Sequence, residues 1–291
     1  MTALDVSYTH TIAAPPDRVF RALTDPADLT VWFAEGVAID ARPGGGFSFW
    51  GRHTYGTPAH PGIQTRLHTF EPDREIAFDW PLEGQAGRVT LSLAPKDDGT
   101  AVTARHVLAD SPAIGRAREL VDDLWRMHLG ALGTHLSGQP VTLPDFADPH
   151  PQVRLSIHVD APRAAVWRTL TDPALLDQWL TKAAVIDLAA GTLDFGWRYE
   201  ENGREVVVPP MQLLEIAEPE RLVMEWRDWR GDPDVPHQRV TWLLSEDGAG
   251  TRVDLVHDGF TRTVDISDYP WGWRWFLQQF RTVGESAAAN S

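Results

Sequence analysis

The sequence predicts an α+β protein made of two tandem copies of one domain, each with a curved antiparallel sheet, a long C-terminal helix and two short helices. Three observations predict this class: an internal repeat at a near-constant offset, a series of alternating strand-like segments in each copy, and one long amphipathic segment that closes each copy. The chain has 291 residues, which is enough for two domains of ordinary size.

Matching segments show the repeat. The pentapeptide Leu-Thr-Asp-Pro-Ala occurs at residues 23–27 and again at 170–174, so Asp25 and Asp172 define an offset of 172 − 25 = 147. The further matches at this offset are Trp32 with Trp179, Ile39 with Ile186, Trp50 with Trp197, Glu71 with Glu218, and Arg74 with Arg221. His106 matches His257 at the larger offset 257 − 106 = 151, which indicates a short insertion in the second copy. We therefore expect domains at 1–138 and 152–291, joined by a proline-rich linker at 139–151.

Each copy is expected to begin with one strand and two short helices. Residues 5–12 and 153–159 alternate between apolar and polar side chains, which predicts half-buried strands. An Ala-Pro pair follows each strand, and proline suits the first turn of a helix. The Thr-Asp-Pro step then ends the first helix and begins the second, which carries Trp32 in one copy and Trp179 in the other.

Six further strands and a closing helix are expected in each copy, because the apolar period changes to two and later returns to a helical one. The expected strands of the first copy are 37–40, 46–50, 63–70, 75–80, 88–93 and 101–108. Those of the second copy are 184–188, 193–199, 206–216, 222–226, 240–244 and 252–257. The closing helices are expected at 114–136 and 270–283. One long helix can cover one face of such a sheet, and a space between them would be the natural ligand site.

Composition limits the function classes. The net charge of −15 argues against a nucleic-acid partner, since phosphate binding needs a basic surface. The absence of cysteine excludes disulfides and thiolate chemistry. The sequence shows neither a signal-peptide pattern nor an apolar run long enough to cross a bilayer, so a cytoplasmic protein without a membrane partner is expected. No pair of histidines has a convincing metal-ligand spacing, and neither a metal nor a cofactor is expected.

The ordered motifs resemble the START/Bet v 1-like (SRPBCC) superfamily, and within it the branch related to the activator of Hsp90 ATPase. The resemblance rests on Thr24-Asp25-Pro26 with Trp32, on Glu71-Pro72-Asp73-Arg74, and on their counterparts in the second copy. It implies a helix-grip fold, a seven-stranded sheet wrapped on a C-terminal helix. Members of this superfamily bind lipids, sterols, polyketides and other apolar molecules, and some are polyketide aromatases or cyclases. Two-domain members occur in polyketide and enediyne pathways, where some act as binding or self-protection proteins.

The candidate ligand-binding residues are aromatic or polar side chains on the expected strands and closing helices. They are Trp50, Arg66, His68, Trp80, Arg105, Trp125, His128, Trp197, Tyr199, Trp226, Trp242 and Trp273. Tryptophans at strand spacing either line a cavity or pack as core, and the core interpretation is favoured. Arginines on strands more often face solvent. Asp79 could act as an acid or base only if it is buried.

His106 and His257 occupy matching positions near the end of the last strand. A catalytic base would need an orienting carboxylate, and the sequence fixes none, so a structural role is favoured. The crowding of Trp271, Trp273 and Trp275 on one helix predicts that at least one of them points outward or toward the other domain.

Three functions remain open from the sequence. The first is binding of an apolar, partly aromatic small molecule, such as a polyketide or enediyne, with the two domains packed on each other. The second is a polyketide aromatase or cyclase, and the third is a chaperone-binding module, which predicts an exposed apolar patch. Because the copies differ in their long loops and in tryptophan content, we also expect their two cavities to differ.

Overall fold

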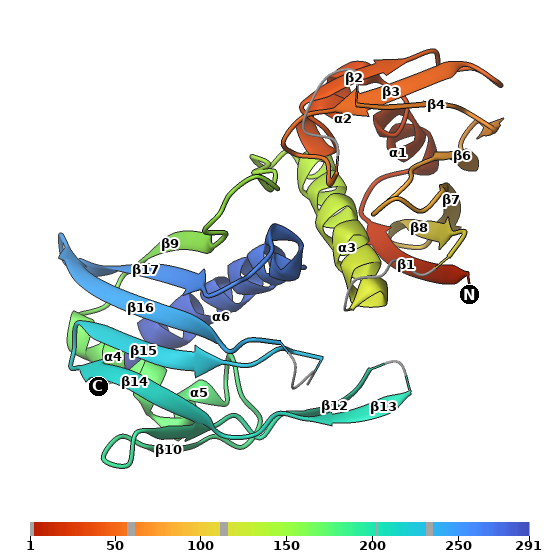
Figure 1. The fold of residues 1–291 in the computed structure, drawn as a ribbon. Helices are drawn as coiled ribbons and strands as arrows, with labels where there is room; N and C mark the ends of the chain where they lie inside the picture. The colour runs from red at the N-terminus through yellow and green to blue at the C-terminus, as the bar shows by residue number, and fades with distance from the viewer. Residues whose placement is uncertain (1–2, 57–61, 111–115, 202, 231–234, 291) are drawn as a thin grey trace. The chain divides into compact units, whose positions relative to one another are not determined.

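The computed structural model describes residues 3–56, 62–110, 116–201, 203–230 and 235–290 (Figure 1). The chain forms two compact units. The first unit comprises Met1–Pro149 together with Arg262–Asp268, and the second comprises His150–Thr261 and Tyr269–Ser291. The boundary between Pro149 and His150 lies within the expected linker. Within the described ranges, no helix is long and apolar enough to cross a membrane.

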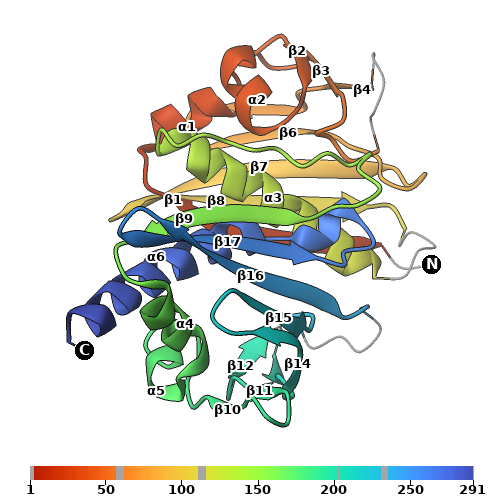
Figure 2. The ribbon, with the colours of Figure 1, turned by 90° about the vertical axis from the view of Figure 1, so that its left-hand side faces the viewer.

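The first unit contains eight strands and three α-helices among its described residues. They are β1 (Leu4–Ile12), α1 (Pro16–Ala22), α2 (Pro26–Trp32), β2 (Gly36–Ile39), β3 (Gly46–Trp50), β4 (Ile63–Arg66), β5 (Thr69–Glu71), β6 (Glu75–Asp79), β7 (Gly87–Lys96), β8 (Gly99–Leu108) and α3 (Ala117–Leu136). The antiparallel strands form a five-stranded sheet in the order β1-β8-β7-β6-β5 and a three-stranded sheet in the order β2-β3-β4. Helix α3 lies across one face of the larger sheet (Figure 2).

The single strand expected at 63–70 is wrong, since the chain divides it into β4 and β5. At the break, Leu67 donates its backbone N–H to Gly45 O and accepts from Gly44 N–H, while His68 N–H donates to Ala77 O. The chain therefore changes partner from β3 to β6 at residues 67–68. This exchange divides the expected seven-stranded sheet of the first copy into two sheets.

The second unit has the expected seven-stranded sheet, in the order β10-β11-β14-β15-β16-β17-β9, and a separate β12-β13 hairpin. Its elements, with the 3₁₀ helix η1 that belongs to the first unit, are β9 (Val153–Val159), α4 (Arg163–Thr171), α5 (Pro173–Leu176), β10 (Val185–Asp187), β11 (Thr192–Asp194), β12 (Arg198–Glu201), β13 (Arg204–Val207), β14 (Met211–Ala217), β15 (Arg221–Trp226), β16 (Gln238–Asp247), β17 (Gly250–Asp258), η1 (Thr263–Ile266) and α6 (Tyr269–Ala289). The hairpin arises where two expected strands are broken.

The strand expected at 193–199 ends early, at Asp194. Its side chain accepts a hydrogen bond from Gly196 N at 2.8 Å, and Gly196 has a φ of +66°, which turns the chain out of the sheet. The strand expected at 206–216 is interrupted by Pro209 and Pro210, which have no N–H to donate to a neighbouring strand. Both expectations were therefore wrong in treating a bent segment as one strand.

The helix boundaries also differ from those expected. Helix α6 continues to Ala289 rather than ending at 283, since its alanine-rich end favours the helix. Helix α5 ends at Leu176, before Trp179 and Leu180. Helix α3 begins at Ala117, and positions 114 and 115 of the expected helix lie outside the described residues. The short helix η1 was not expected.

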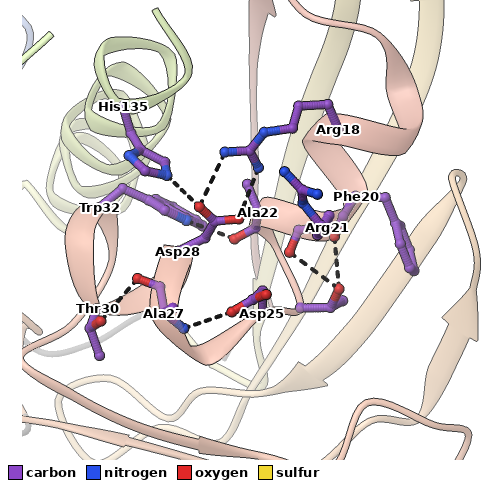
Figure 3. Close-up of polar contacts among 11 residues, drawn as sticks. Arg18, Phe20, Arg21, Ala22, Asp25, Ala27, Asp28, Thr30, Trp32 and His135 are labelled. Atoms are coloured by element: carbon purple, nitrogen blue, oxygen red, sulfur yellow. Dashed lines mark hydrogen bonds and ion pairs between the residues drawn. The ribbon is translucent and has the colours of Figure 1, made fainter. Parts of the chain in front are cut away.

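The repeated Thr-Asp-Pro and Trp motif has the same structural role in both copies, and Figure 3 shows it in the first. The side chain of Asp25 caps α2 by accepting from Ala27 N at 2.8 Å, and Asp172 caps α5 by accepting from Ala174 N at 2.8 Å. The indole of Trp32 donates to Ala22 O at 2.8 Å, and that of Trp179 donates to Thr169 O at 3.0 Å. Trp32, the last residue of α2, and Trp179, three residues after α5, thus each bond to the end of the first helix of their copy, which explains why the spacing recurs.

The structural register corrects one part of the repeat. Ile39 and Ile186 match in the two copies, and their partners on the neighbouring strand are Phe47 and Leu193. The offset between these two partners is 193 − 47 = 146, one less than the offset of the isoleucines. The second hairpin is one residue shorter than the first. Trp50 and Trp197, which match at 147 in the sequence, therefore do not occupy equivalent positions.

The segment Arg262–Asp268 is part of the first unit, although it follows β17 in the sequence. Asp265 accepts from Arg116 at 3.4 Å, and Asp268 accepts from Arg126 at 3.3 Å. The hydroxyl of Thr263 donates to Asp145 O at 2.9 Å. Helix α3 and the chain after it therefore provide the partners that hold this segment.

Candidate functional site

The space between the sheets and α3 in the first unit is filled by aromatic side chains. Alternate residues of one strand, Phe47 and Phe49, face this space, and so do Phe78 and the following Trp80. Ring centres lie 5.0 Å apart for Phe47 and Phe78, and 5.3 Å apart for Phe49 and Trp80. We call the buried residues Trp32, Phe33, Phe47, Phe49, Phe78, Trp80, Trp125 and His128 the aromatic core of the first unit.

The pocket that the described residues form within the aromatic core is small. The pocket between Trp32, Phe47, Leu91 and their neighbours has a volume of about 10 Å³, room for about one water molecule. Binding pockets for small molecules usually measure about 300 to 1,000 Å³. The bulky rings of the aromatic core take up the space that the sequence analysis assigned to a ligand, so a ligand would have to displace some of them.

The corresponding space in the second unit holds a larger side chain. Leu91 pairs with Ile76 across β7 and β6, and Trp242 pairs with Leu222 across β16 and β15. Trp242 therefore replaces Leu91, and its ring packs 5.7 Å from that of Trp179. The two copies thus differ at the position that lines the small pocket of the first.

His128 of α3 is the most unusual member of the aromatic core. It is buried to 1% exposure, and its ring centre lies 5.1 Å from that of Phe33 and 5.8 Å from that of Trp80. Neither of its ring nitrogens has a partner that meets hydrogen-bond geometry. Burial lowers the pKa of His128 to about 3, against a smaller opposing effect of the Trp32 backbone, so the imidazole is neutral.

Trp80 also carries a buried polar atom without a partner, its indole N–H. The equivalent residue in the second unit is Trp226, whose indole N–H donates to the Tyr269 hydroxyl at 3.2 Å. The closing helices match at an offset of 148, because Trp125 and Trp273 make the same bond to the repeated histidine. At this offset the first unit has Val121 at the position of Tyr269. Two adjacent side chains of the first unit therefore hold polar atoms that the fold itself does not satisfy.

His106 and His257 form a duplicated structural arrangement. Trp125 donates to Nδ1 of His106 at 3.4 Å, and Trp273 donates to Nδ1 of His257 at 3.0 Å. An indole N–H can only donate, so each Nδ1 is an acceptor and each Nε2 carries the proton. These Nε2 atoms lie 2.9 Å from Trp80 O and 2.9 Å from the side-chain oxygen of Gln238.

Both matching histidines are therefore neutral and fully used by the fold. Burial lowers the pKa of His106 to about 4 and that of His257 to about 3. Neither ring has a free nitrogen for proton transfer. This is the structural role that the sequence analysis favoured.

Three of the polar candidates lie on the outer surface of the first unit. Arg66 is exposed, and Arg105 forms an ion pair with Asp5, with Nε and Oδ1 at 2.9 Å. His68 donates from Nε2 to one carboxylate oxygen of Asp79 at 2.7 Å, and Arg88 donates to the other at 2.7 Å. Burial raises the pKa of Asp79, but the hydrogen bonds from His68 and Arg88 outweigh it, and the pKa falls below the ordinary value. Asp79 is exposed and ionised, so it lacks the burial that an acid or base at pH 7 would need.

The aromatic candidates divide between the interior and the margins. Trp80, Trp125, Trp226, Trp242 and Trp273 are buried, whereas Trp50, Trp197 and Tyr199 are half-buried. The indole of Trp197 donates to Leu180 O at 2.8 Å, which anchors the chain after β11. Trp275 is 59% exposed, which confirms that one of the crowded tryptophans of α6 points outward.

Two other features of the described residues bear on possible sites. An open groove of about 450 Å³ lies between β9 and α6 of the second unit, beside Leu155, Ile157 and Trp275. Over the described part of the chain, no group of three or more histidine, aspartate or glutamate side chains is arranged to hold a metal ion.

The comparisons with known proteins agree with this architecture. The family model described as activator of Hsp90 ATPase homolog 1-like protein matches residues 13–137 and again residues 160–285. The chain belongs to this family. The two matches correspond to the two copies, which confirms the tandem arrangement and the resemblance seen in the motifs. No curated protein matches the chain in sequence.

Several solved structures are similar to the chain. DynU16, a protein in the dynemicin biosynthetic locus, is 17% identical, with 98% of this chain and 96% of that chain covered and a TM-score of 0.43. CalU16 from Micromonospora echinospora is 26% identical, with 47% of this chain and 76% of that chain covered and a TM-score of 0.37. A protein from Mesorhizobium loti is 21% identical, with 47% and 100% covered and a TM-score of 0.39.

The sequence analysis missed a polar network that joins α3 to the two short helices of the first unit (Figure 3). Asp28 accepts from Arg18 at 2.8 Å and lies 2.6 Å from Nε2 of His135. Arg18 and Asp28 are ten residues apart, but His135 lies more than a hundred residues further along the chain. A sequence pattern therefore could not bring the three residues together. The network has no counterpart in the second copy, where the matching positions are apolar, so the repeat gave no signal for it.

Proposed function

We propose that the chain binds an apolar, partly aromatic small molecule between the sheet and α3 of the first unit. The observation that supports this is the aromatic core, whose rings line the inner face of the sheet opposite the helix. Rings of this kind offer a large flat contact surface to an apolar ligand. The family to which the chain belongs has a fold of the ligand-binding type.

A polyketide or enediyne natural product is the ligand class that we propose within this function. This part of the proposal rests on the family resemblance, because the geometry of the aromatic core does not select a ring system. Members with this tandem layout are expected to serve in biosynthesis or in self-protection.

Binding requires the aromatic core to open, because the present pocket has a volume of about 10 Å³. A ligand would move rings such as Phe33 or Phe47 out of the space that they occupy. We therefore expect saturable binding with an association rate below that of a preformed site.

Tryptophan fluorescence tests the proposal. The full chain is titrated with a panel of apolar polycyclic compounds, including polyketide-derived ones, and the emission is recorded. Binding in the first unit predicts saturable quenching that changes in amplitude in Trp80→Phe but not in the matched variant Trp226→Phe. Absence of saturable quenching across the panel would refute the proposed function.

A chaperone-binding role is a second candidate, favoured by exposed apolar side chains on the second unit. Val185 on β10 is 66% exposed and Leu214 on β14 is 57% exposed, and Leu188 and Ile216 are exposed nearby in sequence. Strands β10 and β14 flank β11 in one sheet. Chaperone binding that is lost in Leu214→Glu, with folding retained, would support this candidate, and unchanged binding in that variant would remove it.

The enzyme alternative has less support. A cyclase would need a histidine or carboxylate free to transfer a proton inside the cavity. His106 and His257 use both ring nitrogens within the fold, and Asp79 lies at the surface. The ring nitrogens of His128 have no hydrogen-bond partner, but burial lowers its pKa to about 3, which makes it a weak base at pH 7.

A further inference from the structure

Two neighbouring polar side chains inside the first unit have atoms that no protein group satisfies. They are Trp80, at the indole N–H, and His128, whose ring nitrogens have no partner within hydrogen-bond geometry although the Trp32 backbone lies close enough to affect its pKa. Both residues are at least 99% buried, and their ring centres are 5.8 Å apart with 59° between the ring planes. Leaving a buried donor or acceptor unpaired destabilises a fold, so this arrangement calls for a specific reason.

The second unit shows that the fold does not require either unpaired group. Trp273 matches Trp125 in its bond to the repeated histidine, so the offset along the closing helices is 273 − 125 = 148. At this offset the position of His128 is occupied by Phe276. The second copy therefore has an apolar, half-buried ring at the matching helix position, whereas the first copy buries a histidine there.

The indole N–H groups give the same contrast. Trp226 donates to the Tyr269 hydroxyl, whereas Trp80 faces no such group because Val121 stands in place of the tyrosine. The first copy thus differs from the second at two positions, and both differences leave polar atoms at one place in the aromatic core.

The chemistry of these atoms specifies what they can bind. Neutral imidazole has one N–H donor and one acceptor nitrogen, and the indole adds a second donor. Two N–H groups on rings this close together can converge on one acceptor oxygen. A carbonyl oxygen has two lone pairs and needs no proton of its own, so it can accept both hydrogen bonds while the rest of the molecule contacts the surrounding rings.

We propose that the first unit binds an aromatic ketone or a similar apolar carbonyl compound, whose oxygen accepts hydrogen bonds from Trp80 and His128. This inference rests on the proposed function, since it assumes that the aromatic core admits a small molecule. It goes further by assigning the polar contact, the two residues that make it, and the functional group of the ligand. In the second unit the matching residues Trp226 and Phe276 offer neither group, and the unpaired indole N–H there belongs to Trp242, at a different position.

The experiment compares benzophenone with diphenylmethane, which has the same two rings and no carbonyl group. Binding of each compound to the full chain is measured by isothermal titration calorimetry. We expect benzophenone to bind at least about tenfold more tightly, because the carbonyl satisfies donors that the hydrocarbon leaves unpaired. In His128→Phe and in Trp80→Phe, the preference falls to within about threefold, while diphenylmethane binds as well as before. The matched control Trp226→Phe keeps the full preference.

The possible failures are distinguishable. If both compounds bind equally well to the wild-type chain, or if His128→Phe keeps the preference, the carbonyl site is refuted and the proposed function stands. If neither compound binds, the proposed function fails and this inference fails with it. A thermal melt provides a readout without ligand: His128→Phe should have a melting temperature no lower than that of the wild type. A drop of several degrees would show that the ring nitrogens have partners within the fold and would overturn the inference.

Discussion

Three fully buried histidines should make this protein sensitive to mild acid. Burial lowers the pKa of His106 to about 4, and of His128 and His257 to about 3, whereas an unfolded chain has a histidine pKa of about 6.5. Between these values the unfolded chain binds a proton that the folded chain excludes. The stability contributed by the neutral rings is therefore complete above about pH 6.5 and is lost as the pH falls.

The expected magnitude at pH 5 does not depend on how far each pKa is lowered. The folded histidines are still neutral at that pH, so the loss follows from the gap of about 1.5 pH units between pH 5 and the unfolded pKa. At 1.36 kcal/mol per unit, each histidine costs about 2 kcal/mol, and the three together cost about 6 kcal/mol. This is comparable with the whole stability of many domains.

Urea unfolding followed by circular dichroism at pH 7.5 and pH 5 measures the effect. His128→Phe removes one titrating ring, so its loss between the two pH values should be about 2 kcal/mol smaller than that of the wild type. Trp226→Phe serves as the control, since it lowers stability at both pH values without removing a histidine. Equal unfolding free energies at pH 5 and pH 7.5, or an unchanged loss in His128→Phe, would refute the reasoning.

Three further predictions concern stability. Asp28→Asn should lower the unfolding free energy at pH 7 by about 1 to 3 kcal/mol, because it removes the charge that pairs with Arg18 and His135. Burial raises the pKa of Asp28, but the hydrogen bonds from Arg18 and His135 outweigh it and hold the pKa below the ordinary value. In acid unfolding curves the difference from wild type should therefore persist above about pH 4 and shrink as the pH falls through the lowered pKa. Trp242→Leu should cost about 3 kcal/mol in urea unfolding, since it opens a cavity beside Trp179; a loss below about 1 kcal/mol would mean that the ring does not fill that space. Trp32→Phe and Trp179→Phe should each cost about 1 to 2 kcal/mol at pH 7, because each leaves a buried carbonyl unpaired; a loss in only one of them would contradict the shared role of the motif.

The duplication and the order of elements could be predicted because they depend on contacts between residues that are close in the sequence. The Thr-Asp-Pro step caps a helix through residues two positions apart, and the tryptophan that follows reaches a carbonyl ten residues back. Such contacts leave a fixed spacing in the sequence, and the spacing recurs in both copies. The outward position of Trp275 follows in the same way from helical geometry.

The filled interior could not be predicted from the sequence. Whether Phe47, Phe49 and Trp80 line a cavity or close it depends on how far the sheet lies from α3, which no local pattern reports. The strand break at Leu67 was missed for a similar reason, since it depends on a change of partner from β3 to β6. The unpaired atoms of His128 became visible only when the side chains around them were known.

The place of Arg262–Asp268 in the first unit affects how the chain can be divided. The gene encodes two repeats, but the first folded body takes a short segment from beyond β17 as well as the whole first repeat. A fragment ending at Pro149 would lack Asp265, which accepts from Arg116 just before α3, and Asp268, which accepts from Arg126 on α3. Repeat and folded unit therefore do not coincide in this protein, so cutting the chain at the boundary between the repeats would not cut it at the boundary between the units.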